Sequence, residues 1–379
     1  MTIRKTGVFQ PHLLAAAVAL GVATQAGAVD FELGEIQGKF DSTLSIGGSW
    51  STRNPDKNFI SNNSGTGVVG KGSARVIDDG RQNFRAGENF STVFKGLHDL
   101  ELKYGDSGAF VRGKYWYDFE QKDGSQHFYD ISDQGRDQAA SASGGQILDA
   151  FIYHNYTVAD LPGNVRLGKQ VVSWGESTFI PNGINAINPV DVSALRSPGS
   201  EVKEALVPVP MLYLSQGQTD NLTAEGFYQL EWKPTVVDNC GTFFGSDSAA
   251  TGCDDRNVVA GRDLPPGVAQ NTGGAAAVAA GRDDVYLPRG SSRDARDSGQ
   301  FGLALRWFLP DFNDTELGAY AMNYHSRGPY ISETQTIGRY TPIAGLPPAL
   351  NAAQAQFAAI RGSNYFLDYP EDIRLYGLS

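Results

Sequence analysis

Alternating apolar and polar residues predict a β-strand over residues 107–119. One side of this strand is apolar and largely aromatic: Val111, Tyr115, Tyr117 and Phe119. The other side is charged: Arg112, Lys114 and Asp118, with Phe110 and Trp116 as exceptions. A soluble β-sandwich buries its apolar side, whereas a transmembrane barrel turns that side to lipid. The alternation alone therefore leaves both classes of protein open.

The same two-residue period recurs along the chain and predicts further strands in residues 39–50, 90–104, 146–158, 163–174, 221–232, 301–309 and 315–325. Short turns at 105–108, 159–164 and 310–314 join three pairs of them into hairpins. In residues 221–232, one side carries Leu222, Ala224, Tyr228, Leu230 and Trp232, and the other carries Thr223, Glu225, Gln229 and Glu231. The chain is thus predicted to be all-β and antiparallel.

Loop lengths favour the membrane class. Long polar loops over residues 53–83, 121–145 and 233–298 alternate with short turns, as in outer-membrane barrels. Aromatic residues at strand ends match interfacial girdles: Trp50, Phe119, Trp232, Trp307 and Tyr324. Cross-strand aromatic packing in a soluble core is the alternative. A charge facing mid-membrane lipid costs roughly 2–4 kcal/mol, so the charged sides should face inward.

The fold predicted from these features is an antiparallel transmembrane β-barrel of the Gram-negative outer membrane, with long loops. We count about nine or ten candidate strands, and the sequence stops at Gly377–Ser379 within the start of a strand. We therefore expect an incomplete barrel that lacks its C-terminal strands, because a barrel in lipid must close on itself.

Residues 173–215 interrupt the strand rhythm with five prolines, which exclude a paired central strand over most of this length. Short helices are expected at 193–197 and 200–207, the second capped by Ser200. In a barrel such a segment belongs in the lumen or mouth, where it would act as a constriction or plug. An ordinary surface loop is the alternative.

A further helix is predicted at 347–362, begun by Pro348 and ended by Gly362.

Charged and polar residues in and around this segment are the candidate site. The predicted constriction consists of Trp174, Glu176, Asn188, Asp191, Arg196, Lys203 and Glu204. Lumen-facing charges are predicted at Arg112, Lys114, Asp118, Arg166, Lys169, Glu225, Glu231 and Arg306. Such charges can ring a constriction and select solutes, and capping of turns with mutual ion pairing is the alternative explanation. The scattered histidines form no metal motif, so no catalytic, metal or cofactor residue is predicted.

Residues 1–28 have the three parts of a secretory signal peptide: Arg4 and Lys5, an apolar core over 13–22, and small residues at 26–28. The exported domain then spans 29–379. The net charge of -11 argues against a nucleic-acid partner. Export favours a disulfide between Cys240 and Cys253, worth roughly 3 kcal/mol in the chain-entropy model. A metal site formed by the two cysteines is the alternative, but no histidine is nearby to complete it.

The central stretch also carries a family resemblance. Gly168-Lys169-Gln170, then Trp174-Gly175-Glu176, then Asn188-Pro189-x-Asp191 resemble the signature of bacterial outer-membrane proteins catalogued as domain of unknown function 1302. The resemblance extends over nearly the whole exported chain to residues 369–379. It implies an outer-membrane location and a β-barrel, with no assigned chemistry. It also implies an association with systems that transport lipids or other hydrophobic compounds.

We therefore expect a non-enzymatic channel or transporter for small, hydrophobic molecules, narrowed by the proline-rich segment. Its expected partners are outer-membrane lipid, a small hydrophobic solute and an envelope transport complex. Three alternatives stay open: a barrel without a pore that serves as an accessory or scaffold of such a complex, a secreted soluble β protein, and an envelope enzyme, which lacks a supporting motif.

Overall fold

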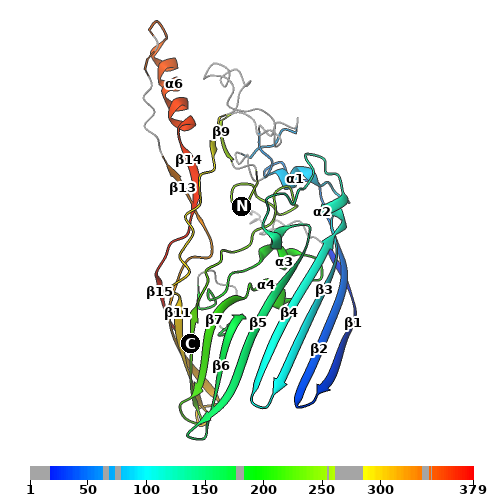
Figure 1. Cartoon of the computed structure of the whole chain (residues 1–379). Coiled ribbons are helices and arrows are strands. Elements are labelled where there is room, and N and C mark those ends of the chain that lie inside the picture. Colours follow the sequence, from blue (N-terminus) through cyan, green and yellow to red (C-terminus); the bar gives the residue numbers. More distant parts are fainter. Residues whose placement is uncertain are drawn as a thin grey trace, which may run out of the picture.

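The computed structural model describes residues 18–62, 68–72, 78–175, 183–253, 256–260, 285–334, 341–342 and 344–379. Its main feature is one sheet of eleven antiparallel strands (Figure 1). In sheet order these are β1 (Val18–Leu33), β2 (Ile36–Trp50), β3 (Asn89–Tyr104), β4 (Ser107–Asp118), β5 (Ser143–Val158), β6 (Leu161–Gln170), β7 (Val209–Gly217), β8 (Leu222–Gln229), β11 (Phe301–Leu309), β12 (Thr315–Tyr324) and β15 (Ile373–Leu378).

The all-β antiparallel prediction is confirmed, but the described sheet is not closed. β1 and β15 are its two edges, and no hydrogen-bonded ladder joins them. Two small sheets lie outside it: β9 (Arg256–Ala260) with β10 (Val285–Pro288), and β13 (Tyr330–Thr334) with β14 (Asn364–Asp368). The short helices are α1 (Asp79–Asn83), α2 (Phe119–Asp123), η1 (Gln138–Ala140), α3 (Val192–Arg196) and α4 (Val202–Ala205).

The two ends of the sheet differ in their connections. Short turns join consecutive strands at one end, whereas the connections that carry α1 to α4, and the extension with β13, β14 and α6 (Pro348–Arg361), lie at the other (Figure 1). The predicted turn at 159–164 is shorter than expected: only Ala159 and Asp160 form it, with φ of 51° and 63°. Pro162 therefore lies inside β6, at its turn-proximal end, where its missing N–H is tolerated.

The faces of the sheet have inverted polarity. One face, which we call the open face, exposes large apolar side chains such as Ile46, Ile152 (60% exposed) and Leu303 (63% exposed). The opposite face, which we call the covered face, buries Lys95, Lys114 (7% exposed), Asp118 (5% exposed), Gln170 and Gln229. Because side chains alternate along a strand, each strand contributes to both faces.

The predicted aromatic strand ends fall into two groups. Trp50, Phe119 and Trp307 are exposed as expected, but Trp232 and Tyr324 are buried, at 7% and 3% exposed. Trp232 lies beyond the end of β8 at Gln229, so it leaves the strand alternation and packs against Tyr369 instead. Tyr324 shares the covered face with Tyr320 and Met322 because it is an even number of residues away from them.

Helix α6 confirms the predicted helix at 347–362. The predicted strand 163–174 ends earlier, at Gln170. Within the part of the chain that the structure describes, no helix combines the length and the apolar character needed to cross a membrane.

Candidate functional site

The proline-rich segment lies between β6 and β7 and crosses the covered face. Gln170 and Val209 are direct partners in the β6–β7 ladder, so the whole segment is an insertion between two paired residues. The sheet curves around α3 and α4, which belong to this segment (Figure 1). The two predicted helices are confirmed, and the segment packs onto the sheet rather than forming an ordinary surface loop.

An apolar cluster attaches the start of the segment to one side of the sheet. Ile184 and Ile187 pack against side chains of β7, β8, β11 and β12: Val209, Met211, Tyr213, Phe227, Ala304, Tyr320, Met322 and Tyr324. Trp174, 1% exposed, belongs to the same cluster, and its ring centroid is 5.5 Å from those of Phe227 and Tyr320. Glu176 lies outside the described residues.

Asn188 joins the two ends of the segment to each other. Its Oδ1 accepts a hydrogen bond from the Val172 N–H at 3.0 Å, and its Nδ2 donates to Val207 O at 2.9 Å. The side chain is 2% exposed, so these bonds satisfy an amide that would otherwise be costly to bury. Gln229 Nε2 adds a bond to Ile187 O at 2.6 Å.

Two buried ion pairs attach the segment to the opposite side of the sheet. Lys95 Nζ of β3 lies 2.6 Å from Glu204 Oε1, and Lys114 Nζ of β4 lies 3.4 Å from Asp191 Oδ2. All four side chains are at most 10% exposed. Burial raises the pKa of Asp191, and the Lys114 ammonium opposes that rise.

The same two acids also cap the short helices. Asp191 accepts a hydrogen bond from the Ala194 N–H at 2.8 Å at the start of α3. Glu201, rather than the predicted Ser200, is the N-cap of α4, and Glu204 completes its capping box. Each acid therefore fixes a helix of the segment and binds a lysine of the sheet, which couples the local fold to its docking.

Gly47 allows close contact between β2 and the segment. A Cβ on Gly47 would lie 2.8 Å from the Cβ of Pro198, closer than side chains pack. The segment thus touches strands from β2 to β12 across the covered face.

The remaining predicted constriction residues lie nearer the surface of the segment. Arg196 pairs with Asp238, and its guanidinium stacks over Phe244 at 4.9 Å from the ring centroid. Burial raises the pKa of Asp238, and Arg196 opposes that rise. Lys203 pairs with Glu201 at 3.0 Å, where both side chains are partly exposed.

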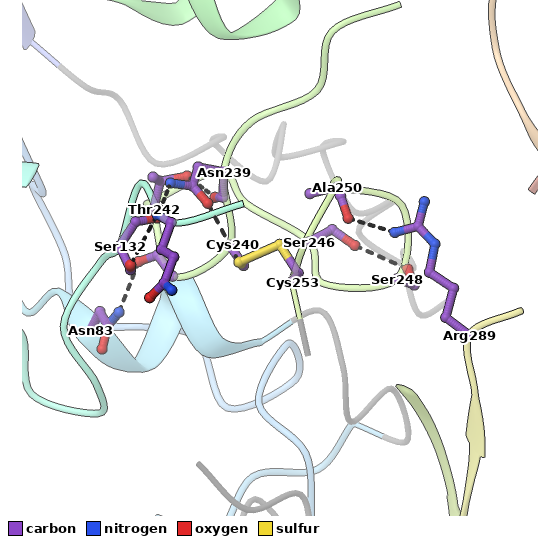
Figure 2. Close-up of a disulfide and its surroundings, with 12 residues drawn as sticks. Asn83, Ser132, Asn239, Cys240, Thr242, Ser246, Ser248, Ala250, Cys253 and Arg289 are labelled. Carbon is purple, nitrogen blue, oxygen red and sulfur yellow. Dashed lines mark hydrogen bonds between the residues drawn. A yellow bond between two sulfur atoms is a disulfide. The ribbon is translucent and has the colours of Figure 1, made fainter. Parts of the chain in front are cut away.

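A disulfide loop lies against the long connections of the sheet (Figure 2). Cys240 and Cys253 are bonded as predicted, with Cα atoms 5.9 Å apart, so their sulfurs do not form the alternative metal site. Asn83 Nδ2 donates to Gly241 O at 2.8 Å, and Asn239 Nδ2 donates to Ser132 O at 3.0 Å. These bonds tie the disulfide loop to the connections that follow β2 and β4.

Between β3, β4 and α3 lies a cavity of about 80 Å³, lined by Lys95, Lys114, Arg196, Glu204, Asp238 and Phe243 among others. Its lining combines both signs of charge with aromatic rings. The volume suits a few water molecules rather than a drug-sized ligand. We therefore interpret it as space between the segment and the sheet and not as a binding pocket.

Below the segment, the covered face carries paired charges on the strands. Arg112 forms a bidentate pair with Asp99 at 2.7 and 2.8 Å, and Asp149 lies 3.3 Å away. Arg306 lies 3.6 Å from Glu225 and also donates to Trp174 O. These contacts fit the expected mutual ion pairs.

Asp118, Arg166, Lys169 and Glu231 complete the predicted lumen-facing set. Asp118 ends β4 and accepts hydrogen bonds from the N–H groups of the first turn of α2. Arg166 lies on the covered face opposite Tyr213. Lys169 lies on the open face with Leu167, contrary to the prediction, because it is three positions after Arg166, and an odd spacing places two residues on opposite faces. Glu231 lies beyond β8 and pairs with Lys233 at 3.2 Å.

The prediction missed Lys95, Asp99 and Asp149, which are the partners of Glu204 and Arg112. Lys95 and Asp99 lie on the same side of the strand 90–104, so the alternation of that strand was enough to place both on the covered face. Their pairing with residues far along the chain required the register of the sheet, which alternation does not give.

The histidines have structural contacts where the chain is described. His325 Nδ1 accepts a hydrogen bond from the Asp372 N–H at 3.0 Å, and its Nε2 lies 2.9 Å from Ser298 O.

The model of the family described as "Protein of unknown function (DUF1302)" matches residues 10–379. No curated protein and no solved structure matches the chain significantly.

Proposed function

Because the chain belongs to the DUF1302 family, whose description assigns no activity, we propose a function from the structure itself. The protein is an outer-membrane β-barrel that passes small, hydrophobic molecules, and the segment between β6 and β7 narrows their path. The observation that carries this proposal is the inverted polarity of the sheet, with apolar side chains exposed and charged side chains buried. A soluble sheet protein would bury the apolar face.

Lipid explains this distribution physically. Exposed Ile152, Leu303 and Leu305 favour a hydrocarbon environment, whereas charges such as Arg112 would cost roughly 2–4 kcal/mol each at mid-membrane depth. A sheet in lipid must also pair both of its edges, because unpaired backbone groups are costly there. The proposal therefore requires partners for β1 and β15.

The path should be widened by removing the segment. Since Gln170 and Val209 are ladder partners, residues 171–208 can be replaced by a four-residue turn without changing strand register. We expect the single-channel conductance of the purified protein in a planar bilayer to rise by about twofold or more, because the constriction is gone.

A matched control is available at the far end of the molecule. Thr334 and Asn364 are also ladder partners, so residues 335–363, which include α6, can be replaced by the same turn. This deletion should leave the conductance unchanged. A conductance that is unaffected by removal of residues 171–208 would contradict the gating role.

One observation favours a second function. The segment is held on both sides of the covered face by buried contacts, which suits a permanently closed barrel. Such a protein would be an accessory or scaffold of an envelope transport complex. It would show no conductance before or after replacement of residues 171–208, and other envelope proteins would co-purify with it.

A further inference from the structure

Arg166 lies near the middle of the covered face with an aromatic side chain on each neighbouring strand. Its guanidinium carbon is 5.1 Å from the ring centroid of Tyr213 on β7 and 5.8 Å from that of Phe151 on β5. Its Nε donates to Asn164 Oδ1 at 2.9 Å. Among the described residues, neither Nη1 nor Nη2 has a hydrogen-bond or ion-pair partner. Four N–H donors of a half-buried cation therefore have no acceptor in the part of the chain that the structure describes.

The other arginines on the covered face of the main sheet are occupied. Arg112 binds two carboxylates, and Arg306 binds Glu225 and the carbonyl of Trp174. The acids nearest Arg166 are engaged as well. Glu101 accepts a hydrogen bond from Tyr153 at 2.8 Å, and Glu225 accepts one from Tyr213 at 3.0 Å. The free donors of Arg166 are thus a specific feature of this position.

We propose that Arg166, with Tyr213 and Phe151, binds the carboxylate of an amphipathic molecule that has one anionic end and an apolar, preferably aromatic, body. A guanidinium presents two parallel N–H groups that match a carboxylate. The half-buried ring of Phe151 offers apolar surface to the rest of the molecule, and the buried ring of Tyr213 packs against the guanidinium. This inference rests on the proposed function and narrows its solute class from hydrophobic molecules in general to hydrophobic carboxylates.

The geometry also explains why the site would be selective. A neutral analogue loses the charge-assisted bonds, and a small anion without a body gains nothing from the rings. Asn164 holds Nε and orients the guanidinium plane, so its loss should weaken binding less than loss of the cation does.

Binding can be measured without transport. The intact protein in detergent is titrated with 4-phenylbutyrate, with the corresponding amide, and with acetate, by isothermal titration calorimetry. We expect 4-phenylbutyrate to bind at least about tenfold more tightly than either comparison compound. Arg166→Gln should weaken its binding by about tenfold, and Arg166→Lys should weaken it less.

Lys169→Gln is the matched control, since it removes one positive charge from the same strand on the open face. It should leave the binding constant unchanged. Equal binding by wild type and Arg166→Gln, or equal binding of acid and amide, would overturn the proposal. Failure of the transport proposal is distinguishable, because a protein that binds 4-phenylbutyrate through Arg166 but gives no conductance has the site without the pore.

Discussion

The Lys95–Glu204 contact shows how one residue's surroundings decide its energetic role. Both side chains are at most 10% exposed, so either charge left alone would be poorly solvated. Lys95→Met should therefore lower the free energy of unfolding by about 3 kcal/mol. The double variant Lys95→Met/Glu204→Gln should recover much of that loss. It removes both charges, and the amide oxygen of the introduced glutamine can still accept the hydrogen bond from the Glu201 N–H. Guanidinium unfolding followed by tryptophan fluorescence measures both effects.

Lys39→Met is the control for this pair. Lys39 contacts Asp41 at 3.5 Å with both side chains about half exposed, so its loss should change the free energy of unfolding by less than about 1 kcal/mol. An equal loss of unfolding free energy for Lys95→Met and Lys39→Met would show that burial of the Lys95–Glu204 pair does not increase its effect on stability.

Alternation predicted the residues of the covered face well where the strands are regular. Lys114, Asp118, Arg166 and Glu225 lie there as expected. Lys169 does not, because it is an odd number of positions away from Arg166 and so lies on the opposite face of the same strand. Partners such as Asp238 for Arg196 depend on how long connections fold over each other, which local pattern does not specify.

The sequence predicted whether a stretch forms a strand or a helix, but it did not predict the residues at which these elements end. β8 ends at Gln229 because the chain leaves the sheet there for a long connection, and this places Trp232 in a separate core. The helix α4 begins at Val202, after the N-cap Glu201, because the reciprocal bonds between Glu201 and Glu204 form a capping box. The end of β8 was thus decided by tertiary contacts that compete with local preference, and the start of α4 by a choice between two neighbouring residues that can both cap a helix.

The β5–β6 turn stores backbone strain that can be removed. Ala159 has a φ of 51°, a conformation that costs an alanine roughly 1–2 kcal/mol and costs glycine little. Ala159→Gly should therefore raise the free energy of unfolding by about 1 kcal/mol, measured in the same denaturant experiment. Ala150→Gly, in the middle of β5, should instead lower it by about 0.5–1 kcal/mol. A loss of stability in Ala159→Gly would show that the turn is not strained.

At the scale of the whole molecule, β1 runs across the predicted signal-peptide cleavage point. The strand covers Val18–Leu33, whereas cleavage is predicted between Ala28 and Val29. Removal of the leader would leave Val29–Leu33 paired with Ile36–Phe40 and would free the rest of β2 along that edge. In lipid, the freed backbone groups would need a new partner.

N-terminal sequencing and intact mass of the protein extracted from membranes test this arrangement. We expect the first residue to be Val29, since the small residues before it suit the signal peptidase. Reduction should add the mass of two hydrogens, because Cys240 and Cys253 are bonded. A chain that still begins before Val18 would retain all of β1 and would contradict cleavage.

The order of strands in the sheet has a consequence for how the molecule assembles. β1 to β7 each pair with the next strand along the chain, and the pairs joined by short turns can form as hairpins with little loss of loop entropy. Ile184 and Ile187, however, bury themselves partly against Ala304 of β11 and Tyr320 of β12, which join the sheet only after a long connection. The segment that crosses the covered face therefore completes its docking late, after the wall of strands that it spans has been built from both sides.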